Sequence, residues 1–233
     1  MELIDLADHA GDEARYDRYL AKLCDELEFD YASYATANPL TGDVLGYATY
    51  PDEWKRHYGQ SQMHEVDPTL YTSARSIAPV DWSRFRRDRN FNRVFDDAGE
   101  FGISKRGLTV PIRGPFGDCG LLSVTRDCGD TEWLQLKQKV IGNLQVAAVH
   151  IHDSVIQSGT LIAALGHQAL SQREVEILQW CAMGKMQQDI ADILTISHRT
   201  VEVHLRSART KLRALTTAQA VGRGIALGMI EPG

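Results

Sequence analysis

The sequence lacks the patterns that mark membrane, secreted and metal-binding proteins. It has no apolar run of about 18 residues and no basic segment followed by an apolar stretch near Met1, so we expect a soluble, cytoplasmic protein without a membrane partner. Repeats and low-complexity tracts are absent as well. The four cysteines form neither a CxxC pair nor a Cys/His cluster, which argues against a disulfide framework and against zinc.

Basic residues are scarce, and their distribution is uneven. The 233 residues include 25 lysines and arginines against 31 acidic residues, a net charge of −6. From Gly166 onward the chain has 8 basic and 6 acidic residues, so this end carries +2 and the remainder carries −8. The length allows two compact domains, and an acidic body with a mildly basic end is typical of a protein that contacts DNA only through that end.

Helix start signals recur in the last third of the chain. Each is a serine or threonine whose hydroxyl can bond a free backbone N–H of the first turn, and two are followed three residues later by Glu or Gln, which completes a capping box. The caps are Ser171 with Glu174, Ser197, and Thr216 with Gln219. Together with a short helix expected over 187–194, they predict an all-α domain of four helices over residues 170–233.

The helix expected from His198 to about Leu212 is apolar on one side and basic on the other. Val201, Leu205 and Ala208 recur at helical spacing and should face inward. A short helix, a tight connection and such a second helix form a helix-turn-helix, which presents side chains to the major groove. An exposed amphipathic helix on an ordinary bundle has the same pattern, and the helix alone does not separate the two.

The outward positions of this helix fall into two groups. Those in the first two and a half turns should meet base edges: Arg199, Glu202, Val203 and Arg206. Those at the sides and toward the end are better placed for phosphates: Thr200, His204, Arg209 and Lys211.

Residues 1–152 mix helical and strand patterns. Helices are expected over 12–26, 53–60, 68–76, 89–99 and 131–152, and strands over 29–37, 44–50, 107–112 and 120–125, with turns at 38–42 and 113–118. This order predicts an α/β domain, an α-β-α sandwich with an antiparallel sheet, in which a small-molecule pocket can open between sheet and helices. Residues 153–169 are predicted to form a linker to the C-terminal domain.

The C-terminal residues resemble the four-helix DNA-binding domain of LuxR-type regulators. The similarity is carried by Leu170–Lys185, Ile190–Ala191, Ser197–His204 and Lys211–Leu212. Glu174, Leu178, Gly184, Thr200 and Val201 stand where the motif of that family expects them. Gly184 also has a physical reason, because a glycine after a helix readily adopts the left-handed conformation that ends it.

Segments of the first domain resemble the autoinducer-binding domain of LuxR-type quorum-sensing receptors. They are Tyr50–Trp54, Tyr58, Val66–Pro68, Val80–Ser83 and Glu100–Ile112, followed by Ser123. They occur in the order of that domain and precede the matching output domain. The loop from Gly102 to Gly107 holds one residue more than in some members, which is a departure from the pattern.

The resemblance implies a ligand, an N-acyl homoserine lactone, and a role for each matching side chain. Trp54 would donate its indole N–H to the lactone carbonyl, the Asp67 carboxylate would accept the amide N–H, and Tyr50 would donate to the amide carbonyl. Ser123 would lie near the amide or a 3-oxo group. Tyr58 and Trp82 would pack against the acyl tail and the ring.

These residues also have simpler structural roles. Asp67 followed by Pro68 is a favourable helix start, and this role is compatible with ligand binding because a carboxylate has two oxygens. Trp54, Tyr58 and Trp82 could each pack in an ordinary core. Small residues on the first two strands, Ser33, Ala35, Gly46 and Ala48, leave room for a long or aromatic acyl group if they face the pocket.

The prediction is therefore a ligand-responsive transcription regulator and not an enzyme, with no cofactor. Its expected partners are an inverted-repeat DNA site, a second copy of the chain in a homodimer, and RNA polymerase. Dimer contacts are expected from helix 131–152 and from the helix after Thr216.

Two alternatives are less well supported by the residues. A response regulator would need an acidic cluster after a first strand, whereas this chain opens with a helix. A lactone-cleaving enzyme would need a metal cluster or an activated nucleophile, although Asp67 beside Tyr50 is a conceivable base. His150 and His152 suggest no metal site, since side chains two residues apart on a helix point in different directions.

Overall fold

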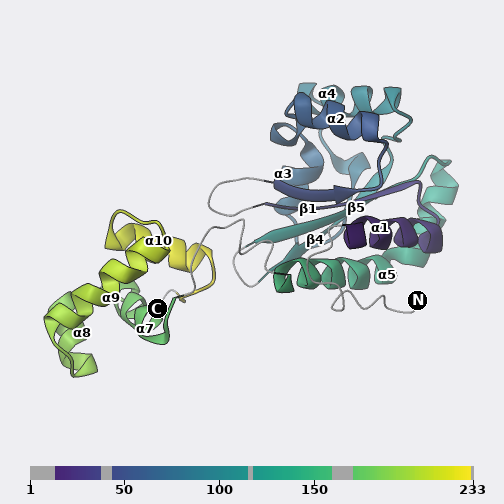
Figure 1. Ribbon diagram of the computed structural model, residues 1–233. Helices are drawn as coiled ribbons and strands as arrows, with labels where there is room; N and C mark the ends of the chain where they lie inside the picture. The colour runs from purple at the N-terminus through teal and green to yellow at the C-terminus, as the bar shows by residue number, and fades with distance from the viewer. Residues whose placement is uncertain (1–13, 38–43, 115–117, 159–169, 232–233) are drawn as a thin grey trace. The chain divides into compact units, whose positions relative to one another are not determined.

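The structure is a computed structural model that describes residues 14–37, 44–114, 118–158 and 170–231. These residues form two compact units, an N-terminal one within 14–158 and a C-terminal one within 170–231 (Figure 1). The predicted turn at 38–42, the middle of the turn at 113–118 and most of the predicted linker lie outside the described residues. Within the described ranges, no helix combines the length and apolarity needed to cross a membrane.

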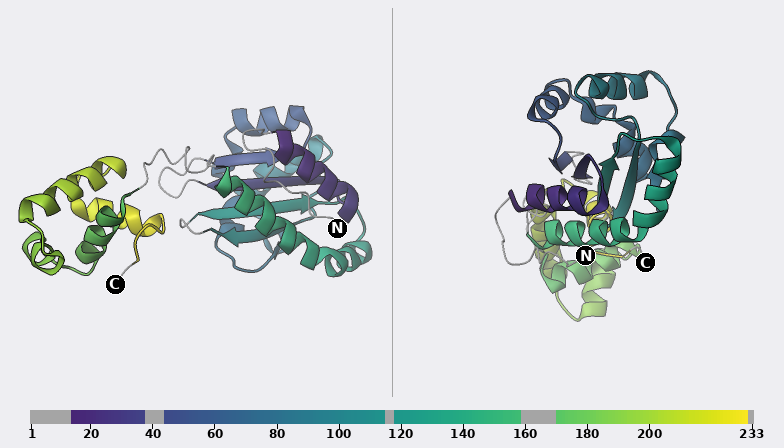
Figure 2. Two further views of the ribbon diagram at one scale, coloured as in Figure 1. Left: turned by 60° about the horizontal axis from the view of Figure 1, so that its bottom comes forward. Right: turned by 90° about the vertical axis from the view of Figure 1, so that its right-hand side faces the viewer.

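The N-terminal unit is built on a five-stranded antiparallel sheet with strand order β2-β1-β5-β4-β3. The strands are β1 (Tyr31–Ala37), β2 (Val44–Ala48), β3 (Val80–Asp81), β4 (Gly107–Arg113) and β5 (Cys119–Thr125). The helices are α1 (Ala14–Leu27), α2 (Asp52–Gln60), α3 (Pro68–Ala74), α4 (Arg89–Glu100) and α5 (Asp130–Gln157), with short 3₁₀ turns η2 (Met63–Glu65) and η3 (Trp82–Arg84). Helices α1 and α5 cover one face of the sheet, and α2, α3 and α4 lie on the other (Figures 1 and 2), which confirms the α-β-α sandwich.

Successive side chains of each strand point to opposite faces of the sheet, and this decides which of them pack against each helical layer. Tyr34 points to the α5 side, where its hydroxyl lies 2.7 Å from Nδ1 of the buried His152. The ring of Tyr47 packs against Tyr16 of α1, with centroids 4.5 Å apart. A side chain at Gly120 would place its Cβ 2.4 Å from His152, so this position requires glycine. Residues one position away along each strand therefore face α2, α3 and α4.

Two elements differ from the sequence prediction. Helix α5 continues five residues beyond His152, because Ile151 and Val155 are both fully buried and extend its apolar face. Residues 153–157 of the predicted linker are thus helical. Strand β3, which the sequence did not predict, has only two residues and is too short to show alternation. Its Asp81 accepts hydrogen bonds from Lys137 and from Nε1 of Trp133 (3.1 Å), which tie this edge of the sheet to α5.

The C-terminal unit consists of four helices, as predicted. They are α7 (Gln172–Ala182), α8 (Gln187–Leu194), α9 (His198–Lys211) and α10 (Thr217–Ala226). Both halves of the Ser171–Glu174 capping box are present, and Gly184 has a φ of +79°, as expected for a left-handed helix end. Gln219 differs from the prediction, because its side chain accepts from the N–H of Leu215 rather than from that of the cap residue Thr216.

Candidate functional site

Asp67 occupies the start of α3, in extended backbone conformation, with Pro68 at the first helical position. Its Oδ1 accepts a hydrogen bond of 2.7 Å from the backbone N–H of Thr69. The predicted role as a helix cap is therefore confirmed. This cap holds the side chain at a fixed angle and leaves Oδ2 directed away from the helix end.

The second oxygen of Asp67 meets an aromatic neighbour on α2. Oδ2 accepts a hydrogen bond of 2.8 Å from the hydroxyl of Tyr58, and Asp67 is only 6% exposed. Burial raises the pKa of Asp67, and the hydrogen bonds from Thr69 and Tyr58 offset only part of that effect. Burial and the nearby Asp67 carboxylate also raise the pKa of Tyr58, so its hydroxyl remains a donor. Each carboxylate oxygen has two lone pairs, so Asp67 retains capacity for a further donor.

Trp54 lies beside this pair and is almost fully buried. Its ring centroid is 5.6 Å from that of Tyr58, 5.5 Å from Phe101 and 5.9 Å from His57. Among the described residues, no hydrogen bond is formed by its indole N–H. Trp54 thus packs in the core of this layer, as the simpler interpretation expected, while its donor stays available.

Tyr50 lies between the sheet and the aromatic cluster that contains Trp54. Its ring lies 5.5 Å from that of Tyr31 on β1, and it packs against the aromatic cluster that contains Trp54 and Trp82. Burial raises the pKa of Tyr50, a hydrogen bond to Ser33 lowers it, and the charge of Asp67 raises it further. Four predicted ligand residues, Tyr50, Trp54, Tyr58 and Asp67, are therefore close together.

Trp82 and Ser123 are joined through a residue that sequence reasoning missed. The indole N–H of Trp82 donates to Oγ1 of Thr109 over 2.8 Å, and this oxygen lies 2.8 Å from Oγ of Ser123. Ser33 is the partner of Ser123 on the adjacent strand, so three hydroxyl side chains form a row across β1, β5 and β4. Only the strand register reveals this row, and no local sequence signal could have indicated it.

Helix α9 presents the predicted DNA-contact residues in two groups. Ser197 caps the helix by accepting from the N–H of Thr200 (3.1 Å), and Val201, Leu205 and Ala208 are buried. The four residues predicted to read bases, Arg199, Glu202, Val203 and Arg206, are exposed. The four predicted to contact phosphates, Thr200, His204, Arg209 and Lys211, are half-buried. This exposure pattern matches the predicted division, although DNA contact itself stays a prediction.

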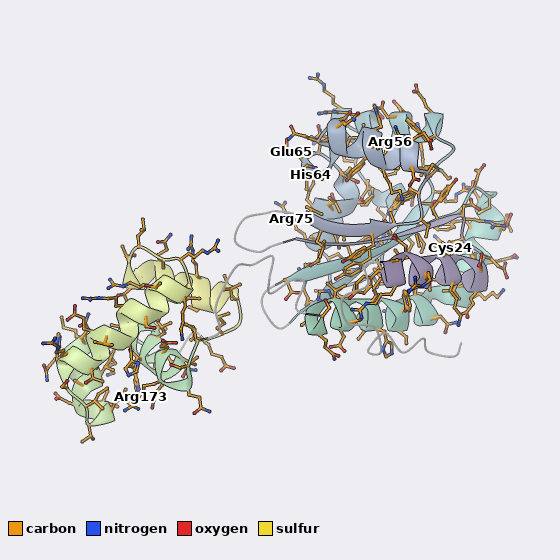
Figure 3. All side chains as sticks on the ribbon, in the orientation of Figure 1. Cys24, Arg56, His64, Glu65, Arg75 and Arg173 are labelled. Carbon is orange, nitrogen blue, oxygen red and sulfur yellow. The ribbon has the colours of Figure 1, made fainter. Side chains whose placement is uncertain are left out.

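Three charged residues of α9 have partners within the unit. Glu202 forms an ion pair with Arg206 one turn later, at 3.3 Å. Lys211 pairs with the buried Glu174 at 2.8 Å, which gives it a structural role in addition to the phosphate contact that we predicted. On α7, Arg173 (labelled in Figure 3) pairs with Glu176 and donates to the carbonyl of Leu194 at the end of α8. The Lys211–Glu174 pair thus joins α9 to α7, and the Arg173 contact joins α7 to α8.

Two family descriptions match this chain over most of its length. The autoinducer binding domain matches residues 12–155, and the bacterial regulatory proteins of the luxR family match residues 168–222. The chain belongs to the LuxR family. This LuxR-family protein is an autoinducer-binding transcription regulator and not an enzyme.

Curated relatives and solved structures agree with this assignment. The LuxR-family chain is 31% identical over 221 residues to transcriptional activator protein RaiR of Rhizobium etli, covering 94% of this chain and 89% of the relative. It is 33% identical over 225 residues to transcriptional activator protein SolR of Ralstonia nicotianae, covering 95% and 94%. The crystal structure of Escherichia coli SdiA matches with a TM-score of 0.75 at 26% identity, covering 94% and 92%. A structure of SdiA in complex with octanoyl-rac-glycerol matches with a TM-score of 0.76 at 26% identity, covering 96% and 91%.

Proposed function

We propose that the autoinducer bound by the N-terminal unit is an N-acyl homoserine lactone. The observation that carries this proposal is the buried Asp67 carboxylate, an acceptor surrounded by the donors of Tyr50, Trp54 and Tyr58. The head group of this ligand has one amide N–H and two carbonyls. Asp67 would accept the N–H, Trp54 would donate to the lactone carbonyl, and Tyr50 would donate to the amide carbonyl.

The acyl chain would run along the sheet from this head-group site. Ser33 pairs with Ala48 and Ala35 pairs with Gly46, which puts all four small residues on the sheet face away from α1 and α5. Ser33, Ala35 and Ala48 keep accessible surface even though α2, α3 and α4 lie on this side. Small side chains here favour a long or aromatic acyl group. The row of hydroxyls that includes Ser123 would bind an oxygen on the chain near the amide.

The test is a calorimetric titration of full-length protein with lactones of increasing acyl length and with an aromatic acyl lactone. The ring-opened acyl homoserine of the same chain is the matched control ligand, because its free carboxylate would be repelled by Asp67. We expect the lactone to bind and the ring-opened form to bind at least tenfold more weakly. A tenfold ratio corresponds to about 1.4 kcal/mol of binding free energy. Equal binding of the two forms would contradict the lactone assignment. Mass spectrometry of co-purified small molecules would identify the acyl group.

We also propose that the protein acts on DNA as a homodimer at an inverted repeat. Each chain supplies one α9, and a two-fold pair of such helices would read two half-sites one helical turn apart. Leu134, Val146 and Val149 of α5 are about half exposed, which supports α5 as a dimer surface, with α10 as a second one. Such a regulator would act in the cytoplasm and would have RNA polymerase as a further partner. Light scattering in the presence of ligand tests this proposal, and a monomer bound to its operator would contradict it.

A further inference from the structure

A cluster of arginines lies at the start of α4, far in sequence from the DNA-binding helix. Residues 84–93 contain five arginines and one aspartate, a net charge of +4 in a domain that is acidic overall. The whole C-terminal unit from Gly166 onward carries only +2. We define this cluster as the arginine patch; its members are Arg84, Arg86, Arg87, Arg89 and Arg93, and all five are exposed.

The patch differs from the lysines of this unit in its partners. All five lysines of the N-terminal unit form ion pairs with carboxylates: Lys22, Lys55, Lys105, Lys137 and Lys139. Among the described residues, the guanidinium groups of Arg84, Arg86 and Arg89 have no such carboxylate partner. Arg87 lies over the ring of Phe91, and Arg93 donates to the carbonyl of Ser61, so neither has its charge neutralised. Exposed guanidinium groups this close in sequence repel one another, and an anion bound between them would offset this repulsion.

An open depression of about 560 Å³ adjoins the patch, and three of the five arginines contribute to its lining. It is lined by Arg87, Asp88, Arg89, Asn92, Arg93, Asp96 and Asp97. The three carboxylates already have donors, because Asp88 caps α4, Asp96 pairs with Lys105, and Asp97 lies 2.9 Å from the His57 ring. The hydrogen-bond donors of this lining are the guanidinium groups and the amide of Asn92. This set suits phosphate oxygens, which guanidinium groups bind through two parallel hydrogen bonds.

We propose that the arginine patch binds the phosphate backbone of DNA that flanks the site held by α9. This proposal rests on DNA binding by the C-terminal unit. The patch and α9 belong to one chain. DNA held by α9 is therefore bound to the same chain as the patch, so even weak contacts between the patch and flanking phosphates would add to the affinity. The contribution of these phosphate contacts to DNA affinity should not depend on the DNA sequence and should fall as the salt concentration rises.

The experiment compares two duplexes that carry the same selected site. One is about 20 base pairs long, enough for two half-sites, and the other extends it by about 15 base pairs of arbitrary sequence on each side. Ligand-bound, full-length protein is titrated with each duplex at several salt concentrations. We expect roughly tenfold tighter binding to the long duplex, with a salt slope larger by about 0.9 for each added phosphate contact.

The test variant is Arg84→Gln combined with Arg86→Gln and Arg89→Gln. It should lose the gain on the long duplex and the added salt slope, while it binds the short duplex and the lactone as wild type does. The matched control removes three exposed, ion-paired cations from the same unit: Lys22→Gln, Lys55→Gln and Lys139→Gln. This control changes the net charge by the same amount and should still bind the long duplex more tightly than the short one.

Several outcomes would overturn the proposal. They are equal affinity of wild type for both duplexes, retention of the gain in the arginine variant, and equal losses in the arginine and lysine variants. Loss of transcription with unchanged DNA binding would also overturn it, because the patch would then contact an acidic protein surface. Failure of wild type to bind even the short duplex would instead contradict DNA binding by α9, so the two failures are distinguishable.

Discussion

At the scale of single residues, Asp67 combines two roles in one side chain. Oδ1 caps α3, and Oδ2 lies against the Tyr58 hydroxyl in a buried aromatic layer. The cap therefore orients the carboxylate that the ligand amide would need. A hydrogen bond at a helix start thus sets the orientation of the carboxylate on which the proposed head-group site depends.

Replacement of Asp67 with Asn tests this arrangement. The amide oxygen can still accept from Thr69, but the ligand amide N–H loses a charged acceptor. We expect lactone affinity to fall by about 1.5–3 kcal/mol, the range for a hydrogen bond to a charged group. Isothermal calorimetry measures the change. Asp88→Asn is the control, since Asp88 caps α4 in the same way at an exposed position and should leave affinity unchanged. Equal affinities of Asp67→Asn and wild type would remove Asp67 from the ligand site.

Glu174 is a second residue of interest, because its neighbours stabilise the ionised form of its carboxyl group. Burial opposes its ionisation, but hydrogen bonds from Lys211, Ser207 and the backbone of Ser171 outweigh burial and lower the pKa of Glu174 to about 2. Because the folded pKa lies below the ordinary value of 4.5, this carboxylate stabilises the unit above about pH 4.5. The contribution is lost as the pH falls from there toward 2.

Glu174→Gln should therefore destabilise the C-terminal unit at neutral pH by about 3 kcal/mol, because it leaves Lys211 without its carboxylate. The difference from wild type should shrink as the pH falls below 4.5. Hydrogen exchange of α7 and α9 amides in the full chain measures both effects. Glu176→Gln, which breaks an exposed pair with Arg173, should cost less than about 1 kcal/mol. A pH-independent difference would contradict the assigned charge state.

At the scale of elements, α9 is the helix whose outer surface we predict to divide between base reading and phosphate contact. The four exposed residues predicted to read bases lie along the first two and a half turns, and the half-buried residues predicted to contact phosphates lie beside them and toward the helix end. The Glu202–Arg206 ion pair joins two of the exposed residues. An acid on this surface repels phosphate, so its presence favours a role in orienting Arg206 or in accepting from cytosine N4.

Selection of operators from random duplexes tests this division. Arg206→Ala should cost about 1–3 kcal/mol and relax the preference at one base position in each half-site. Glu202→Gln should change which operators are preferred. The control is Arg213→Ala, just beyond the helix end, which should leave the consensus unchanged. A single consensus shared by wild type, Arg206→Ala and Glu202→Gln would exclude α9 from base reading.

At the scale of the whole molecule, the two units have separate hydrophobic cores. The N-terminal core lies on both faces of the sheet, and the C-terminal core contains Ile177, Leu178, Val201 and Leu205. We therefore expect each unit to hold its own fold, with the proposed ligand site in one unit and the proposed DNA surface in the other. Ligand binding should add stability to the N-terminal unit by mass action.

Separate expression of the units tests their independence. Residues 1–165 should fold with ligand and bind no DNA, whereas residues 166–233 should fold alone and bind DNA weakly, because they lack the α5 dimer surface. Circular dichroism and gel-shift titrations measure folding and binding. If residues 166–233 bound the operator as tightly as the full chain, dimer-dependent recognition would be wrong.

The sequence by itself determined the features that depend on a few neighbouring residues. The caps Ser171, Ser197 and Thr216 set the helix starts, and Asp67–Pro68 set the start of α3, because a cap bonds N–H groups within three residues of itself. Apolar spacing set the buried side of α9. The family motifs then gave the two domain types and the four residues Tyr50, Trp54, Tyr58 and Asp67, which lie close together.

Only the tertiary structure decided the features that depend on pairing between distant segments. Ser33, Thr109 and Ser123 form a row because β1, β5 and β4 pair in one particular register, and a shift of one residue would turn each side chain to the other face. The same register puts the small residues of β1 and β2 on the sheet face that α2, α3 and α4 cover. Lys211 meets Glu174 only after α7 and α9 pack. Such contacts join segments tens of residues apart, so no local pattern encodes them.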